Sequence, residues 1–178
     1  MSHPNTNGKR KGLPHSKGCF VCGEDNPDGF RGKFELDERN HVRFHFIPRQ
    51  TMQGYGTVMH GGLQATILDE TMGWATAVAS GRMTVLAEIN VRYLLRTPIG
   101  EELIAEAWAT EVKKRLVKAE AVIRDKEGVI YARAHGKFTP LSEEETRYVD
   151  SHLIYHEGDL RIFDHLSAVE GPVHKVPI

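Results

Sequence analysis

One helix-forming segment with almost no polar face constrains this chain more than any other stretch. After a glycine-rich loop at 54–62, apolar residues recur at helical intervals, and a glycine at position 81 favours the end of the helix there. A helix that is apolar nearly all round is normally enclosed, so we expect it to be central. Asp69 and Glu70 lie in its middle, where carboxylates are costly unless they are used or lie on a solvated stripe. The apolar positions are Leu63, Ile67, Leu68, Met72, Trp74, Ala75, Val78 and Ala79.

The segments on either side of this helix show the period-two alternation that is typical of β-strands. Because helix and strands are segregated along the chain, the predicted fold class is α+β with an antiparallel sheet. One curved sheet around the helix is the simplest way to cover it. The predicted strands are 33–37 and 41–47 before the helix, and 86–94, 102–111, 117–123 and 129–139 after it.

The length of 178 residues suits one domain with a tail. We divide the chain into a flexible basic arm (1–18), a central domain (19–140) and an acidic, histidine-containing extension (141–178), in which Ser142 predicts the start of a helix. The net charge of −1 and the absence of a long apolar run argue against nucleic acid or a membrane as partner. Without a secretory signal or a disulfide framework, a cytoplasmic location is expected.

Cys19 and Cys22 form an isolated CxxC pair. The favoured interpretation is a structural turn, but CxxC is also half of a zinc site, so a site completed by His15 or by tail histidines stays open, as does redox chemistry. His152 and His156 are four residues apart and could share a metal on a helix, although a surface helix is favoured. We therefore predict no metal site and no cofactor.

The turn formed by His60, Gly61 and Gly62 leads into the helix. Free N–H groups and the positive end of the helix dipole suit a developing oxyanion there, although tight turn geometry alone would also explain the glycines. Asp69 follows Gly61 by eight residues, which is about 12 Å along the helix axis. The two cannot meet within one chain. If they cooperate, two helices must lie antiparallel about a twofold axis, and the protein is at least a dimer.

Together these features resemble the hotdog-fold acyl-CoA thioesterases, in particular the phenylacetyl-CoA thioesterase (PaaI-like) branch. The resemblance rests on His60 with two glycines and an acid nine residues later on one long helix, and it covers about residues 19–140. Residues 19–29 are similar to a segment that precedes the domain in a subset of this branch, and segments 53–56, 90–93, 98–100 and 125–140 also match the general pattern. It implies a hotdog fold, in which a curved antiparallel sheet wraps a long central helix, here with a C-terminal helical extension.

The resemblance also implies roles for individual residues. Asp69 would be the catalytic carboxylate, as nucleophile or as general base toward water. The N–H of Gly61 would polarise the thioester carbonyl, and His60 would shape the turn. Arg92 and Arg115 would bind the phosphates of coenzyme A. The alternative is that they are solvated charges at the sheet edge. The residues expected to contact the acyl-CoA substrate are Gln53, Gly62, Glu70, Thr84, Arg92 and Arg115.

The implied function is hydrolysis of an acyl-CoA to a carboxylic acid and coenzyme A, without a metal, in a homodimer or homotetramer. Two positions depart from the pattern: Gly54 stands where the family often has Asn or Gln, and Leu86 where it often has Ser or Thr. Both departures remove polar support for an attacking water. The alternative is therefore a non-catalytic protein of the same fold that binds or senses acyl-CoA. Hydration or dehydration of an enoyl thioester would call for a different Asp/His arrangement, which the sequence does not show.

Overall fold

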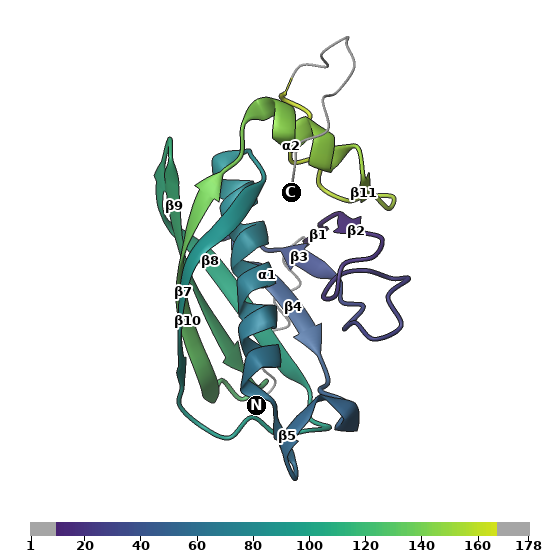
Figure 1. Cartoon of the computed structure of the whole chain (residues 1–178), viewed down its shortest axis with the longest axis vertical. Helices are drawn as coiled ribbons and strands as arrows, with labels where there is room; N and C mark the ends of the chain where they lie inside the picture. The colour runs from purple at the N-terminus through teal and green to yellow at the C-terminus, as the bar shows by residue number, and fades with distance from the viewer. Residues whose placement is uncertain (1–9, 167–178) are drawn as a thin grey trace, which may run out of the picture.

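The structure, a computed structural model, describes residues 10–166. Helix α1 (Gly61–Ser80) lies along one face of a seven-stranded antiparallel sheet with the order β1-β3-β4-β8-β9-β10-β7 (Figure 1). The predicted α+β class, the long helix and all six predicted strands are confirmed. The sheet strands are β1 (Lys11–Gly12), β3 (Phe34–Leu36), β4 (Val42–Phe46), β7 (Thr84–Tyr93), β8 (Leu103–Lys113), β9 (Leu116–Arg124) and β10 (Ile130–Pro140).

The interface between α1 and the sheet forms the core, as the apolar helix predicts. Ile67, Leu68 and Met72 are fully buried there. The facing strands carry small residues, which let the helix approach closely. A Cβ atom on Gly136 of β10 would lie only 3.2 Å from the Met72 Cε. The small residues of this layer are Ala105, Ala107, Ala119, Ala121, Ala132 and Ala134.

Residues 10–18 differ from the expected flexible arm. They form β1, which pairs with β3, and β2 (His15–Ser16), and Leu13 between the two strands is buried in the core. One apolar side chain and two short hydrogen-bonded ladders thus fix a segment whose composition alone favours disorder. Residues 1–9 of the predicted arm lie outside the described residues.

The C-terminal extension begins with the predicted helix, α2 (Glu143–Asp150). Ser142 caps it: its hydroxyl accepts the Glu145 N–H, and the Glu145 carboxylate accepts the Ser142 N–H. The chain then enters β11 (Leu153–Ile154), which pairs with β2 in a separate two-stranded sheet near α2 (Figure 1). The part of the extension beyond residue 166 lies outside the described residues.

A second small sheet precedes α1. It consists of β5 (Gln53–Tyr55) and β6 (Val58–Met59) and follows a 3₁₀-helix (Gln50–Met52). These elements are too short for a periodic sequence pattern.

Among the described helices, none has the length and apolar character needed to cross a membrane.

Candidate active site

The first turn of α1 exposes backbone N–H groups. His60 caps the helix, and its Nδ1 accepts the Gly62 N–H at 3.0 Å. Gly61 is the first helical residue, so its N–H has no partner within the helix. The Tyr93 hydroxyl of β7 donates to the Gly61 carbonyl at 2.8 Å. The turn therefore presents an N–H donor at the positive end of the helix dipole.

Close contacts with side chains favour both glycines of this turn. A Cβ atom on Gly61 would lie 3.3 Å from the Tyr93 Cζ, and one on Gly62 would lie 3.1 Å from the His60 ring. Tight geometry thus explains the glycines, and it also keeps the helix entrance free of side chains. Tight turn geometry and the binding of an oxyanion are therefore compatible interpretations of this turn.

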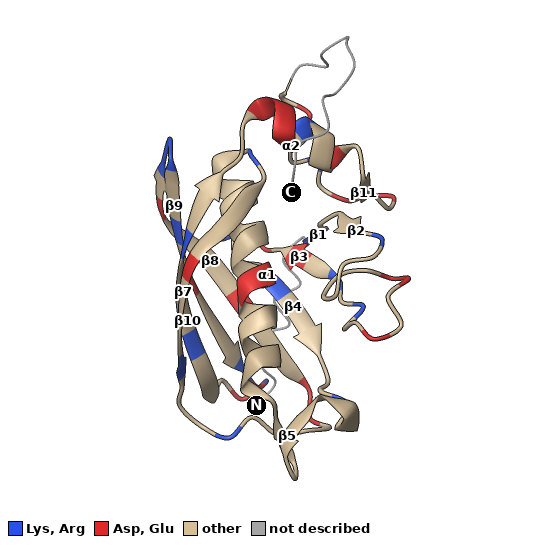
Figure 2. Cartoon of the chain, viewed as in Figure 1, with Lys and Arg blue, Asp and Glu red and all other residues tan. Residues whose placement is uncertain are grey.

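Asp69 lies in the middle of α1 and lines a cavity of about 390 Å³. Its side chain is half-buried, and burial raises the pKa of the carboxyl. Within residues 10–166 no hydrogen bond or ion pair uses this carboxylate. Asp69 and Glu70 are the only acids of α1, and Figure 2 shows them as an acidic band midway along the helix. A partly desolvated carboxylate without a partner is suited to accept a proton or attack an electrophile.

Glu70 is engaged with other side chains, unlike its neighbour. Its Oε1 accepts from the Trp74 Nε1 at 3.2 Å, and the Sγ atoms of Cys22 and Cys19 lie 3.3 and 3.6 Å from the same oxygen. Burial raises the pKa of Glu70 to about 8, and the negative charge of Cys19 adds to the effect. Of the two acids, Asp69 is thus the one with no hydrogen bond on either oxygen among residues 10–166.

The CxxC pair folds over the middle of α1. The Cys22 thiol and the N–H groups of Cys22 and Val21 donate to the Cys19 Sγ, which lowers the pKa of Cys19 to about 5. Both cysteines line the Asp69 cavity. The sequence alone did not predict that the cysteines lie at the site. They are about fifty positions away from Glu70, and a local sequence pattern does not indicate a contact over that separation.

The remaining predicted substrate residues do not lie together: one lines the Asp69 cavity, one lies at the helix entrance, and the two arginines lie elsewhere on the sheet. Thr84 and Leu86, at the start of β7, line the Asp69 cavity, and the Thr84 hydroxyl is hydrogen-bonded to Thr76 at 2.7 Å. Gln53 belongs to β5 and pairs with Met59, beside the helix entrance.

Arg92 and Arg115 lie at opposite ends of the sheet. Arg92 is near the end of β7, next to Tyr93, whereas Arg115 sits in the β8–β9 turn. That turn is level with the start of β7, because Val117 pairs with Phe138 and Phe138 with Leu86. One chain therefore does not bring the two arginines together.

The predicted site thus consists of two half-sites within one chain. His60, Gly61 and Gly62 form one half at the helix entrance, with Gln53 and Tyr93 nearby, whereas Arg92 precedes Tyr93 in β7 and its side chain lies on the other face of the sheet. Asp69, Glu70 and Thr84 form the other half at the cavity. Strand β7 runs from the cavity at its start to the helix entrance at its end.

Comparison with known proteins identifies the fold and gives a family match for the central part of the chain. Residues 56–132 match the family model of the thioesterase superfamily. The structure resembles that of a thioesterase superfamily protein with 26% identity and a TM-score of 0.66 over 69% of this chain and 60% of that one. The match thus spans less than two thirds of that protein's length. No curated protein matches this sequence.

Two further solved structures share the fold. The PaaI protein of the phenylacetic acid degradation operon of E. coli is 18% identical, with a TM-score of 0.58 over 64% of this chain and 81% of that one. A protein from Streptococcus mutans, bound to acetyl CoA, is 16% identical, with a TM-score of 0.55 over 58% of this chain and 82% of that one. Residues 56–132 thus match the thioesterase superfamily, and the long helix and antiparallel sheet of this chain form the hotdog fold.

Proposed function

We propose that this protein hydrolyses the thioester bond of an acyl-CoA to give a carboxylic acid and coenzyme A. The observation that carries the proposal is the half-buried Asp69 carboxylate, which has no partner in the described chain and lines a cavity on a thioesterase-superfamily fold. The acetyl CoA bound to the similar protein from Streptococcus mutans supports a coenzyme A thioester as the class of substrate.

The proposed chemistry uses one carboxylate and one backbone donor. The Asp69 carboxylate takes a proton from water as the water oxygen attacks the thioester carbon, or it attacks that carbon itself. The Gly61 N–H stabilises the negative oxygen of the tetrahedral intermediate, aided by the helix dipole. In the first route, the proton taken from water passes to the leaving thiolate as the C–S bond breaks. In the second route, the C–S bond breaks to release the thiolate and leaves a mixed anhydride on Asp69; water then hydrolyses this anhydride, which restores the carboxylate, releases the carboxylic acid and supplies the proton for the thiolate. These steps need no metal.

The two groups must come from different copies of the chain, because about 12 Å of helix separates them. Strand β7 offers the means of association. Among the described strands it is an edge strand with β10 as its only neighbour in the sheet, and it carries exposed Val85 and Tyr93. Antiparallel pairing with a second β7 would place the Tyr93 end of one copy beside the Thr84 end of the other. Gly61 of each chain would thereby approach Asp69 of its partner.

The lining of the cavity favours an apolar acyl group. Apart from the acids and the cysteines, the wall consists mainly of Trp74, Met83, Val85, Leu86 and Phe138. Such a surface gains free energy by burying hydrocarbon or aromatic carbon and gives no partner to a charged acyl chain. Leu86, which departs from the family pattern, contributes to this apolar wall.

Thiol release from aryl and aliphatic acyl-CoAs tests the proposal. We expect hydrolysis by the wild type and a loss of at least about 100-fold in kcat for Asp69→Asn, because the amide neither accepts the proton nor attacks. Glu70→Gln is the matched comparison, since it alters the adjacent acid of the same cavity and should retain hydrolysis. If Asp69→Asn hydrolyses at the wild-type rate, the assignment of Asp69 is wrong.

The second candidate function is acyl-CoA binding without hydrolysis. Leu86 favours it, because this apolar side chain stands at the cavity where a hydroxyl would help to hold an attacking water. Saturable binding of acyl-CoA with no thiol release from any member of the panel would select this function.

A further inference from the structure

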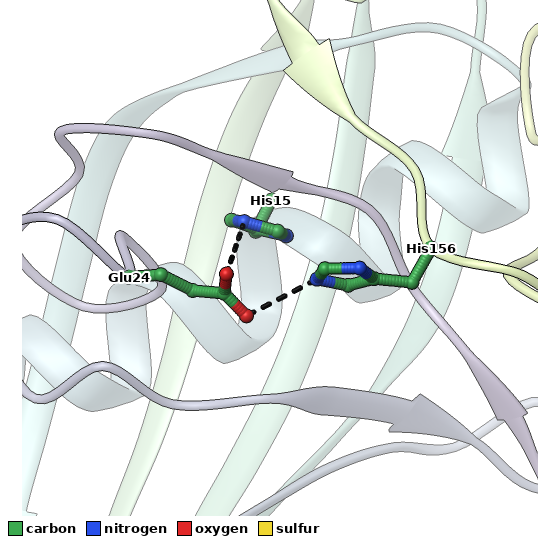
Figure 3. Close-up of side chains that lie close together, drawn as sticks. All are labelled: His15, Glu24 and His156. Carbon is green, nitrogen blue, oxygen red and sulfur yellow. Dashed lines mark hydrogen bonds and ion pairs between the residues drawn. The ribbon is translucent and has the colours of Figure 1, made fainter.

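Three side chains outside the cavity form a compact group of metal-binding atoms. His15 is in β2, Glu24 follows the CxxC turn, and His156 follows β11. The two imidazole rings are stacked with centroids 5.0 Å apart, and one Glu24 oxygen is directed at each ring (Figure 3). The ligand atoms of the three residues all lie within 4.8 Å of one another.

The hydrogen bonding of His15 is incomplete. His15 is 6% exposed, and its buried Nε2 has no hydrogen-bond partner. The nearest Glu24 oxygen is 3.7 Å away, which is too long for a hydrogen bond. A buried nitrogen without a hydrogen-bond partner destabilises the fold.

A divalent cation between the three side chains would give the buried His15 Nε2 a partner. With ligand bonds of 2.0–2.2 Å, the donor atoms of a tetrahedral zinc site are separated by about 3.4 Å. The His15 Nε2–Glu24 Oε2 distance is 3.7 Å and the His156 Nε2–Glu24 Oε1 distance is 3.1 Å, on either side of that value. Small side-chain movements would therefore give three ligand bonds from two neutral imidazoles and one carboxylate.

The surroundings of the group also suit a cation. A cavity of about 90 Å³ adjoins it and offers room for a water molecule as fourth ligand. Asp159 lines this cavity and adds negative charge, whereas Glu35, which also lines it, is ion-paired with Arg10 at 3.2 Å. Lys33 lies 3.8 Å from Glu24, but its side chain is 77% exposed and free to turn into solvent.

We propose that His15, Glu24 and His156 bind one Zn²⁺ ion, which joins the N-terminal segment to the C-terminal extension. Two nitrogen ligands and one oxygen ligand favour zinc over the oxygen-preferring Ca²⁺. The ion would reinforce the β2–β11 ladder, which consists of only two residue pairs. This assignment differs from the prediction of no metal site, and it differs from a zinc site at the CxxC pair, where the cysteines group with Glu70 instead.

Elemental analysis of the full chain, prepared without a histidine tag, tests the proposal. After chelation, incubation with Zn²⁺ alone and desalting, we expect about one zinc per chain and a rise in the unfolding temperature of at least about 5 °C. Incubation with Ca²⁺ should give neither result. Less than about 0.2 zinc per chain would overturn the proposal, because a structural ion is held too tightly for desalting to remove.

Variants locate the ion. His156→Asn and Glu24→Gln change half-exposed side chains and should abolish both the bound zinc and the zinc-dependent rise in unfolding temperature. His152→Asn is the control, since His152 is exposed and hydrogen-bonds within its own segment. Zinc that stays with His156→Asn and is lost from Cys19→Ser would overturn the proposal and place the ion at the cysteines.

Discussion

At the scale of single residues, the central question is what the Gly61 N–H contributes. Proline is well tolerated at the first position of a helix, where it removes the N–H and adds a ring that includes a Cβ atom. The extended conformation of His60 before it (φ −60°, ψ 132°) is also compatible with a following proline. Gly61→Pro is therefore a substitution that deletes the proposed oxyanion donor while preserving the helix.

We expect Gly61→Pro to lower kcat by about 100-fold or more, the usual effect of losing an oxyanion donor. Gly61→Ala is its control, because it introduces a Cβ atom against Tyr93 but keeps the N–H. Steady-state thiol release on both variants separates the two effects. Equal losses in Gly61→Ala and Gly61→Pro would mean that crowding, and not the donor, explains the result.

At the scale of elements, a buried carboxylate on the outer sheet face joins the strands. Glu106 of β8 lies 3.2 Å or less from Arg39, His41, Arg43 and Arg124, which belong to β4, β9 and the β3–β4 turn. Burial by itself raises the pKa of Glu106. The hydrogen bonds from His41 and Arg124, with the charges of the arginines, outweigh that effect and lower the pKa to about 2.

This network predicts a pH-dependent loss of stability in Glu106→Gln. Because the folded pKa lies below the unfolded value of 4.5, the carboxylate stabilises the fold above pH 4.5, and the effect is lost as the pH falls through about 2. At pH 7 we expect the variant to lose about 3 kcal/mol of unfolding free energy, measured by urea denaturation. The difference should shrink toward zero near pH 2.

Glu111→Gln provides the comparison for this prediction. Glu111 also has a pKa lowered to about 2, by Lys113 and Lys118, but this ion pair is on the protein surface. Solvent screens such pairs, so the variant should be much less affected than Glu106→Gln. Equal losses in the two variants would show that burial does not strengthen the Glu106 network.

Elements with a repeating pattern could be predicted from the sequence, whereas contacts between distant segments could not. Helix α1 and the six longer strands follow from apolar periods of 3.6 and 2. Strands β2 and β11 have two residues each, and they exist because chain segments about 140 positions apart meet. The same limit applies to the contact of Cys19 and Cys22 with Glu70.

The candidate site shows the same division. The helix entrance and Asp69 were predicted from residues on one element. Their relation to β7, with Thr84 at one half-site and Tyr93 at the other, emerges only from the folded sheet. The expectation of a flexible segment over 10–18 failed for a related reason, because Leu13 is buried by residues far along the chain.

At the scale of the whole molecule, each proposed active site is shared between two copies of the chain. Chains carrying Asp69→Asn retain the Gly61 donor, and chains carrying Gly61→Pro retain the carboxylate. A mixed dimer of the two therefore contains one complete site and one site that lacks both groups. Neither variant alone contains a complete site.

The most direct test is thiol release by the two variants after coexpression in one cell. Random pairing makes about half of the dimers mixed, and each mixed dimer has one of its two sites intact. We therefore expect about one quarter of the wild-type activity. Each variant expressed alone should show at most about one hundredth. Activity of the coexpressed protein that does not exceed that of the separate variants would contradict a site shared between two copies.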